Sequence, residues 1–179
     1  MERFVLYYRQ GVEQLKIRQL TVDDATRYKA LRLEALRNHP EAFGSDYEAE
    51  KDRPIERYAT RLESEQSMTF GAFHENELVG VVTIVCLGPV KMRHRANLFA
   101  MYVTPSARKQ QVGRQLVEEA LCTLKQHPVI EQVHLSVVRT NEAAKALYRS
   151  LGFESYAIEP RALKVDDTYH DEELMWYRF

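Results

Sequence analysis

Strand patterns and helix patterns alternate in the second half of this sequence. Apolar side chains recur every four residues on one predicted helix face, at Val112, Leu116, Ala120 and Leu124. This spacing predicts a helix from about Gln111 to Gln126. Predicted strands flank the helix at Ala96–Val103 and Gln132–Val138. Such an order allows the two strands to lie parallel in a sheet on which the helices pack.

The C-terminal part of the chain adds one more helix and further strands. The helix contains Ala144, Leu147, Tyr148 and Leu151 and is closed by Gly152. The predicted strands that follow are Phe153–Ile158, Ala162–Val165 and Tyr169–Tyr177, with a turn at Asp166-Asp167 between the last two. Ligands favour the ends of parallel strands and the helix N-termini beside them, so a site is expected within residues 96–158.

The N-terminal half is predicted to begin with an extension, residues 1–14. The elements expected after it are a strand at Leu15–Gln19, a helix at about Asp23–Asn38, a loop or short helix at Glu41–Arg53, a helix at about Ile55–Ser64, and strands at Met68–His74 and Leu78–Leu87 joined by the turn Glu75-Asn76-Glu77. A chain of 179 residues without a linker or repeat is expected to form one domain, residues 15–179. The predicted fold class is α/β (α+β), a mixed central β-sheet of about seven strands flanked by about four helices.

Composition and charge exclude several classes of protein. The formal net charge of −1 lacks the basic surplus with which general nucleic-acid and anionic-membrane binders release counterions. No stretch approaches the roughly 20 apolar residues that span a bilayer. Cys86 and Cys122 lie in apolar or helical patterns without a CxxC motif, which favours free thiols in a reducing compartment. We therefore expect a cytoplasmic protein that binds neither nucleic acid nor membrane.

Charged residues are distributed unevenly along the chain. Leu78–Val117 contains no Asp or Glu, whereas eight acidic residues lie in Glu41–Glu65 and five in Asp166–Glu173. The basic residues of the first segment include Lys91, Arg93, Arg95, Arg108, Lys109 and Arg114. The pattern has two interpretations, either a solvated surface or a basic site for an anionic ligand beside an acidic rim for a cationic one.

The segment Met101–Leu116 leads from a strand into a helix through a turn rich in Arg, Lys and Gln. A helix N-terminus exposes unpaired amides and a partial positive charge, and a small residue such as Gly113 lets a phosphate approach the backbone. The turn can therefore hold a pyrophosphate. The alternative is structural, in that Pro105 and Ser106 end the strand and Arg108 is solvated.

The segment Leu135–Phe153 carries a second pattern, in which Asn141 begins a helix. By itself Asn141 is an N-cap and the apolar residues are core. Together, however, the two segments resemble the GNAT superfamily of acyl-CoA-dependent N-acetyltransferases. Its first motif, Gln/Arg-x-x-Gly-x-Gly/Ala after a strand, is matched by Arg108, Gln111 and Gly113, and its second by Asn141, Ala144, Leu147-Tyr148 and Leu151-Gly152-Phe153. Gln111 replaces the first motif glycine; its amide stays available if its φ is helical, but its side chain takes space beside the phosphates.

The resemblance covers residues 15–179 in element order and implies a GNAT fold, an N-acetyltransferase and acetyl-CoA as the acyl donor. It implies that strand backbone pairs with the pantetheine arm, at Met101, Tyr102 and Val103. The pyrophosphate would be held by the amides of the turn, those of Arg108, Lys109, Gln110, Gln111, Val112, Gly113 and Arg114. Asn141 would contact the pantetheine side of the cofactor, and Tyr148 would face its sulfur.

Acetyl transfer to an amine needs a neutral amine, a stabilised oxyanion and a leaving thiolate. GNAT enzymes often place a base on the strand before the phosphate turn, but Arg95–Met101 has no carboxylate, and His94 is typical of a surface histidine. No base is therefore assigned. A thiol pKa of about 8.5 and a phenol pKa of about 10 make proton transfer from Tyr148 uphill. Tyr148, the one predicted catalytic residue, is expected to donate a hydrogen bond to the developing thiolate, and no nucleophilic triad or metal-ligand spacing is evident.

The acceptor is suggested by acidic residues in the elements that wall the acceptor site of GNAT proteins. They are Asp46, Glu48, Glu50, Asp171, Glu172 and Glu173. They favour a small cationic amine, with a protein N-terminus or lysine side chain as the runner-up. Two alternatives of another class stay open, a non-catalytic acyl-CoA-binding module and a structural domain that self-associates through its sheet. Formation of a homodimer is left open as well.

Overall fold

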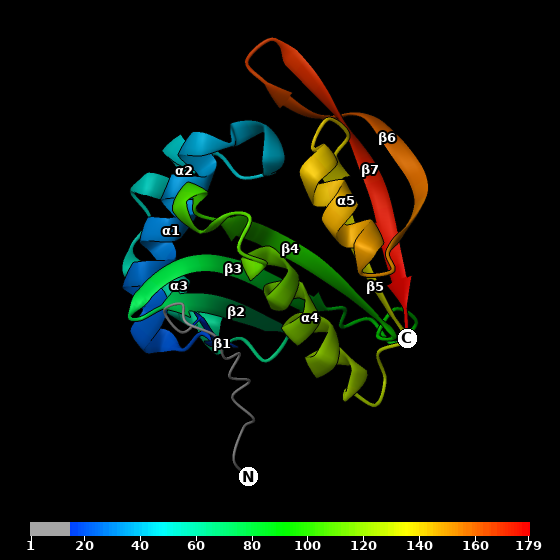
Figure 1. Ribbon diagram of the computed structural model, residues 1–179, viewed down its shortest axis with the longest axis horizontal. Coiled ribbons are helices and arrows are strands. Elements are labelled where there is room, and N and C mark those ends of the chain that lie inside the picture. Colours follow the sequence, from blue (N-terminus) through cyan, green and yellow to red (C-terminus); the bar gives the residue numbers. More distant parts are fainter. Residues whose placement is uncertain (1–14) are drawn as a thin grey trace.

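A seven-stranded mixed β-sheet forms the centre of the computed structural model, which describes residues 15–179 (Figure 1). The predicted extension, residues 1–14, lies outside the described residues. In their spatial order the strands are β1 (Leu15–Gln19), β2 (Ser67–His74), β3 (Glu77–Cys86), β4 (Arg95–Val103), β5 (Gln132–Val138), β7 (Thr168–Arg178) and β6 (Glu154–Val165). Neighbouring strands are antiparallel except β4 and β5, which are parallel.

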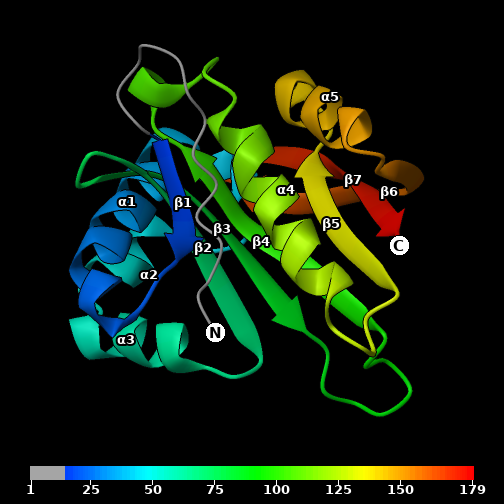
Figure 2. The ribbon, with the colours of Figure 1, turned by 60° about the horizontal axis from the view of Figure 1, so that its bottom comes forward.

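Helices cover both faces of this sheet (Figure 2). They are α1 (Ala25–Asn38), α2 (Tyr47–Lys51), α3 (Ile55–Glu63), α4 (Val112–Lys125) and α5 (Glu142–Ser150), with short 3₁₀ turns at Val22–Asp24, Pro40–Ala42 and Pro105–Ala107. On one face, Tyr28 of α1 and Tyr58 of α3 pack with Val81 of β3 in one core. On the other face, Leu116 of α4 and Tyr148 of α5 pack in a second core. The predicted fold class is confirmed.

The strand pattern was correct except near the C-terminus. Two strands were expected at Phe153–Ile158 and Ala162–Val165, but β6 runs through both, with a register shift between Glu159 and Leu163. Pro160 is tolerated because β6 is an edge strand, so its missing N–H need not remove a ladder hydrogen bond. The segment expected to be a loop or short helix contains the short helix α2.

The parallel strands β4 and β5 pair over only a few residues and then separate. The two strands pair only at Arg95–Asn97 with Gln132–His134. Farther along, β4 carries one extra residue relative to β3, since Val81 lies opposite Tyr102 and Thr83 opposite Phe99. Ala100, inside this bulge, has a φ of 52°. Because a bulge bends its strand, β4 leaves β5 and opens a gap in the middle of the sheet.

Candidate functional site

Two cavities meet at the opening between β4 and β5. The first, here called the α4 cavity, has a volume of about 510 Å³ and lies at the N-termini of α4 and α5. The second, the α1 cavity, has a volume of about 610 Å³ and extends to side chains of α1, β3 and β7. The residues that line both are Ala42, Phe43, Met101, Asn141, Ala144 and Tyr148. A molecule on one side can therefore reach a molecule on the other.

The turn before α4 presents its backbone amides without acceptors. Within the described chain, the amides of residues 109–114 form no backbone hydrogen bond, and the first α4 bond runs from the Gln115 amide to the Gln111 carbonyl. Lys109 and Gln111 have φ values of 62° and 64°, in the left-handed region that favours glycine. Successive amides in such a turn form a concave anion site, strengthened by the helix N-terminus. The φ of Gln111 is thus helical, but left-handed.

Arginine side chains of the turn are held by other protein groups. Arg108 donates from Nε to the Val103 carbonyl at 3.0 Å, and its Nη2 lies 2.9 Å from Nε2 of His39. Arg114 pairs through Nε with Glu118 at 2.8 Å and donates from Nη1 to a serine hydroxyl of α5. The turn can therefore keep its shape while the backbone amides, rather than these guanidinium groups, meet an anion.

Nearly all of the predicted cofactor residues line the α4 cavity. They are Met101, Tyr102, Val103, Arg108, Lys109, Gln111, Val112, Gly113, Arg114 and Asn141. Gln110 is the exception, because its side chain donates to the Ser106 carbonyl at 3.0 Å and lines a separate cavity beside the β2–β3 turn. A Cβ atom on Gly113 would lie 2.9 Å from Cε of Met101 and 3.3 Å from Cδ2 of Leu147. A long side chain at that position would enter the cavity.

Two further features of the α4 cavity suit an extended ligand. Residues 98–103 of β4 have no β5 partner in the described sheet, so one edge of their backbone faces the opening. Asn141 caps α5, since its Oδ1 accepts a hydrogen bond from the Ala144 amide at 3.1 Å. Its Nδ2 group keeps its hydrogen-bonding capacity for a ligand.

Tyr148 stands where the two cavities join. The residue is 5% exposed, and its ring packs edge-on against Phe153 with the ring centroids 5.7 Å apart. Within residues 15–179 no hydrogen bond engages its hydroxyl. Burial raises the pKa of Tyr148 well above its ordinary value near 10, because a phenolate would be poorly solvated there. The hydroxyl is suited to donating a hydrogen bond and unsuited to giving up its proton.

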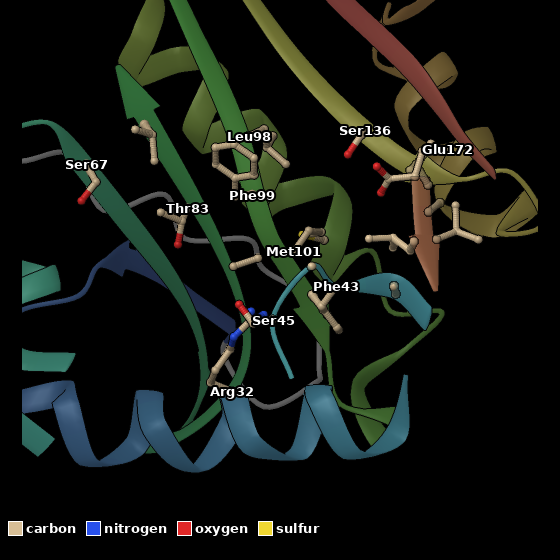
Figure 3. Close-up of a pocket in the computed structure, with 18 of the residues that line it drawn as sticks. Arg32, Phe43, Ser45, Ser67, Thr83, Leu98, Phe99, Met101, Ser136 and Glu172 are labelled. Carbon is tan, nitrogen blue, oxygen red and sulfur yellow. The ribbon is translucent and has the colours of Figure 1, made fainter. Parts of the chain in front are cut away.

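Polar groups face the α1 cavity from opposite sides (Figure 3). Arg32 of α1 and Ser45 lie at one side, and Ser136 of β5 and Glu172 of β7 lie at the other. Burial raises the pKa of the Glu172 carboxyl, an effect that a hydrogen bond with Ser136 partly offsets and the charge of Glu159 adds to. Glu172 therefore places at the cavity a carboxylate that accepts a proton more readily than one in water would.

The six acidic residues predicted to surround the acceptor site do not lie together at the α1 cavity. Among these six residues only Glu172 lines the α1 cavity. The others are engaged elsewhere, as Asp46 caps α2, Glu48 pairs with Lys51, Glu50 with Arg53, Asp171 with Arg139 and Glu173 with Arg149. Local pairing therefore occupies most of the charges that the sequence shows side by side, and the acidic acceptor rim stays a prediction.

Sequence reasoning missed Arg32, which lines the α1 cavity together with Arg61. Arg32 follows Tyr28 by four residues and so lies on the apolar stripe of α1, a signal that could have found it. Neither His94 nor the two cysteines line either cavity, and burial raises the pKa of the Cys86 thiol. A thiolate nucleophile is therefore not supported at the junction.

The free amides of the turn and the opened sheet define a class of proteins that can hold an extended, anionic ligand between two strands. The sequence profile of the acetyltransferase (GNAT) family matches residues 29–153, and the chain belongs to this family. It is an acyl-CoA-dependent N-acetyltransferase with acetyl-CoA as acyl donor, which confirms that part of the sequence analysis. No helix within residues 15–179 has the length and apolar character required to cross a membrane.

Solved structures with the same fold were found across most of the chain. An acetyltransferase of the GNAT family from Streptococcus pneumoniae has 22% identity and a TM-score of 0.79, covering 92% of this chain and 99% of that one. Ribosomal-protein-alanine N-acetyltransferase from Brucella melitensis has 24% identity and a TM-score of 0.80 over 91% and 99%. The yncA protein from Salmonella typhimurium, solved with its cofactor acetyl-CoA, has 17% identity and a TM-score of 0.81 over 92% and 93%. A search of curated protein sequences gave no match.

Proposed function

We propose that this acetyltransferase moves the acetyl group directly from acetyl-CoA in the α4 cavity to the primary amine of a small acceptor in the α1 cavity. The observation that carries this proposal is the shared wall of the two cavities, which includes Met101, Asn141 and Tyr148. A thioester carbonyl held at that wall would be open to attack from the other side. Neither cysteine is there to form a covalent acyl-enzyme.

The donor would lie along β4 and end at α4. Its pantetheine amides would pair with the free backbone edge of Met101–Val103 and meet Nδ2 of Asn141. Its pyrophosphate would accept hydrogen bonds from the amides of the turn, residues 108–114, of which 109–114 form no backbone hydrogen bond in the described chain. The left-handed conformation of Gln111 supports binding despite the missing motif glycine, because it aligns successive amides.

Glu172 is the group that we assign as base. The acceptor amine enters as an ammonium ion, and its proton passes to the Glu172 carboxylate directly or through water. The neutral nitrogen then attacks the thioester carbon, while a backbone amide near Met101–Val103 stabilises the oxyanion. Collapse of the intermediate breaks the carbon–sulfur bond. Tyr148 donates a hydrogen bond to the departing thiolate. As the amide forms, the attacking nitrogen releases its second proton, and the thiolate takes up this proton through water and leaves as free CoA.

Screening purified protein with acetyl-CoA against amines, with release of free thiol as the signal, tests the proposal. Amine-dependent thiol release together with the acetylated amine is expected. Cofactor binding without transfer to any amine would favour the non-catalytic acyl-CoA-binding alternative. A protein N-terminus is the second candidate acceptor, because the similar structure from Brucella melitensis is named as a ribosomal-protein-alanine N-acetyltransferase. Peptides with a free N-terminus belong in the same screen, and homodimer formation stays a prediction.

A further inference from the structure

Two nitrogens of the Arg32 guanidinium group are buried beside the α1 cavity without a hydrogen-bond partner among the described residues. Arg32 is 7% exposed, yet its Nε and Nη1 atoms have no hydrogen-bond partner. Its guanidinium carbon lies 4.7 Å from the centroid of the Phe43 ring. Burying a charged donor without an acceptor is costly, so a native protein rarely keeps one without a use.

A neighbouring carboxylate attracts Arg32 but forms no hydrogen bond to its Nε or Nη1 atom. Glu50 is the nearby acid, but its carboxylate is bound by Arg53 at 2.6 Å and by the Tyr58 hydroxyl at 2.7 Å. Arg61 lines the same cavity and adds a second positive charge. This corner of the α1 cavity therefore holds two guanidinium groups, and Glu50 is not among the described residues that line it.

We infer that Arg32 binds a carboxylate of the acceptor, so that the acceptor is an amino carboxylic acid. The inference rests on the proposed function, which places the acceptor amine on the Glu172 side of the cavity. A guanidinium group offers a planar fork of donors that matches a carboxylate in a bidentate pair. Figure 3 shows Arg32 and Glu172 at opposite sides of the cavity with Met101 between them. One molecule with an acid at one end and an amine at the other satisfies both sides.

Apolar side chains also line the α1 cavity. They include Phe43, Leu98, Phe99 and Met101. A hydrocarbon spacer would pack against them, whereas a second charge in the middle of the acceptor would be desolvated without a partner. The acceptor is therefore an amine and a carboxylate joined by a largely apolar spacer.

Matched pairs of acceptors test the carboxylate site. Each pair consists of an amino acid and its primary amide, taken from the α-amino acids and from ω-amino acids of increasing chain length. In the parent protein, kcat/KM for the best acid should exceed that of its amide by about 10- to 100-fold, the range of charge-assisted hydrogen bonds. Equal rates for acid and amide in every pair that reacts would overturn the inference.

Substitutions assign this preference to Arg32. Arg32→Met should abolish the preference for the acid, so that acid and amide react with similar kcat/KM, and Arg32→Lys should retain part of the preference. Arg37→Met is the matched control, because Arg37 lies on the same helix, is exposed and packs on Tyr47 outside the cavity. A preference that survives in Arg32→Met contradicts the assignment. If that variant does not fold, Arg32→Lys carries the test, and an undiminished preference there is the contradicting result.

A binding measurement separates this inference from the proposed function. In the presence of CoA, hexanoate should raise the Tm of the parent more than hexanamide does, and the difference should vanish in Arg32→Met. That result with no acetylation of any amine would keep the carboxylate site and reject the proposed reaction. Equal effects of hexanoate and hexanamide on the parent would reject the carboxylate site even where amines are acetylated.

Discussion

The buried ring of Tyr148 packs edge-on against Phe153, with centroids 5.7 Å apart and ring planes at 61°. This contact holds the ring, while the hydroxyl stays available at the junction of the cavities. Tyr148→Phe should lower kcat by about 10- to 1,000-fold and leave the Kd for acetyl-CoA nearly unchanged, because the hydroxyl stabilises charge that appears only as the thioester breaks. Steady-state kinetics and calorimetry measure the two quantities.

Tyr177→Phe is the control for that prediction. Tyr177 also packs on Phe153, with centroids 5.5 Å apart, but it lines neither cavity. It should keep the parental kcat. Parental turnover in Tyr148→Phe, with chemistry shown to be rate-limiting, would make Tyr148 a packing residue.

Glu172→Gln should lower kcat by about 100- to 10,000-fold, the usual contribution of a positioned base. Burial raises the pKa of Glu172 above its ordinary value of 4.5, and only the ionised form accepts a proton. The kcat/KM of the parent should therefore fall as the pH drops through this raised pKa, and the Gln variant should lose that limb. An unchanged pH profile in the variant would assign the base elsewhere.

The raised pKa of Glu172 also predicts how the stability of Glu172→Gln differs from that of the parent at each pH. Because the folded-state pKa of Glu172 is raised, ionisation costs stability as the pH rises from the unfolded-state pKa through the folded one. Glu172→Gln removes this cost, so above that window its Tm should equal or exceed the parental Tm. The difference should shrink below the window, where both side chains are neutral. Thermal unfolding at several pH values measures this difference in Tm. A variant that is less stable than the parent mainly at neutral pH would contradict the prediction.

Gly113→Glu should abolish stabilisation of the protein by acetyl-CoA. The new side chain would enter the α4 cavity near Met101 and place a carboxylate near the proposed phosphate site. Gly88→Glu is the matched control, since a Cβ at exposed Gly88 meets only the Gln66 side chain, at 3.7 Å. Thermal shift with acetyl-CoA compares the two, and retained affinity in folded Gly113→Glu would refute the phosphate assignment.

Gln111→Gly should bind acetyl-CoA at least as tightly as the parent. A left-handed conformation costs a residue with a side chain about 1–2 kcal/mol, and glycine loses about 0.5–1 kcal/mol through entropy. The free energy of unfolding should therefore rise by up to about 1 kcal/mol, which urea denaturation can measure. Weaker cofactor binding in this variant would mean that the Gln111 side chain itself contacts the donor.

Much of the fold could be predicted because its elements depend on local patterns. The four-residue spacing from Val112 to Leu124 marks a face that is 0–1% exposed in α4, and β1 and β5 have the predicted bounds. The single strand β6 could not be predicted, because Pro160 breaks a central strand but is tolerated at an edge. Whether a strand lies at an edge depends on the order of the strands in the sheet, which cannot be deduced from a short segment of sequence.

Less of the site could be predicted. The turn before α4 and the helix start at Asn141 could be predicted because each combines a helix start with a motif. Their part in binding acetyl-CoA stays a prediction. The proposed role of Arg32 depends on the lack of a hydrogen-bond partner for two of its nitrogens within the described chain. The acidic residues, in turn, are held by pairings such as that of Glu173 with Arg149, 24 residues earlier in the chain. Such contacts arise from tertiary packing. Charge read along the sequence therefore could not predict which of the named acidic residues face the α1 cavity, where Glu172 alone of the six is found.

Direct transfer between the two cavities is the central claim, and initial rates with both substrates varied test it most directly. If donor and acceptor occupy the α4 and α1 cavities together, double-reciprocal plots of rate against amine concentration at several acetyl-CoA concentrations should give intersecting lines. Parallel lines would indicate that CoA leaves before the amine binds, through a covalent acetyl-enzyme. That result would contradict the account, because direct attack across the opening at Tyr148 requires both substrates at once.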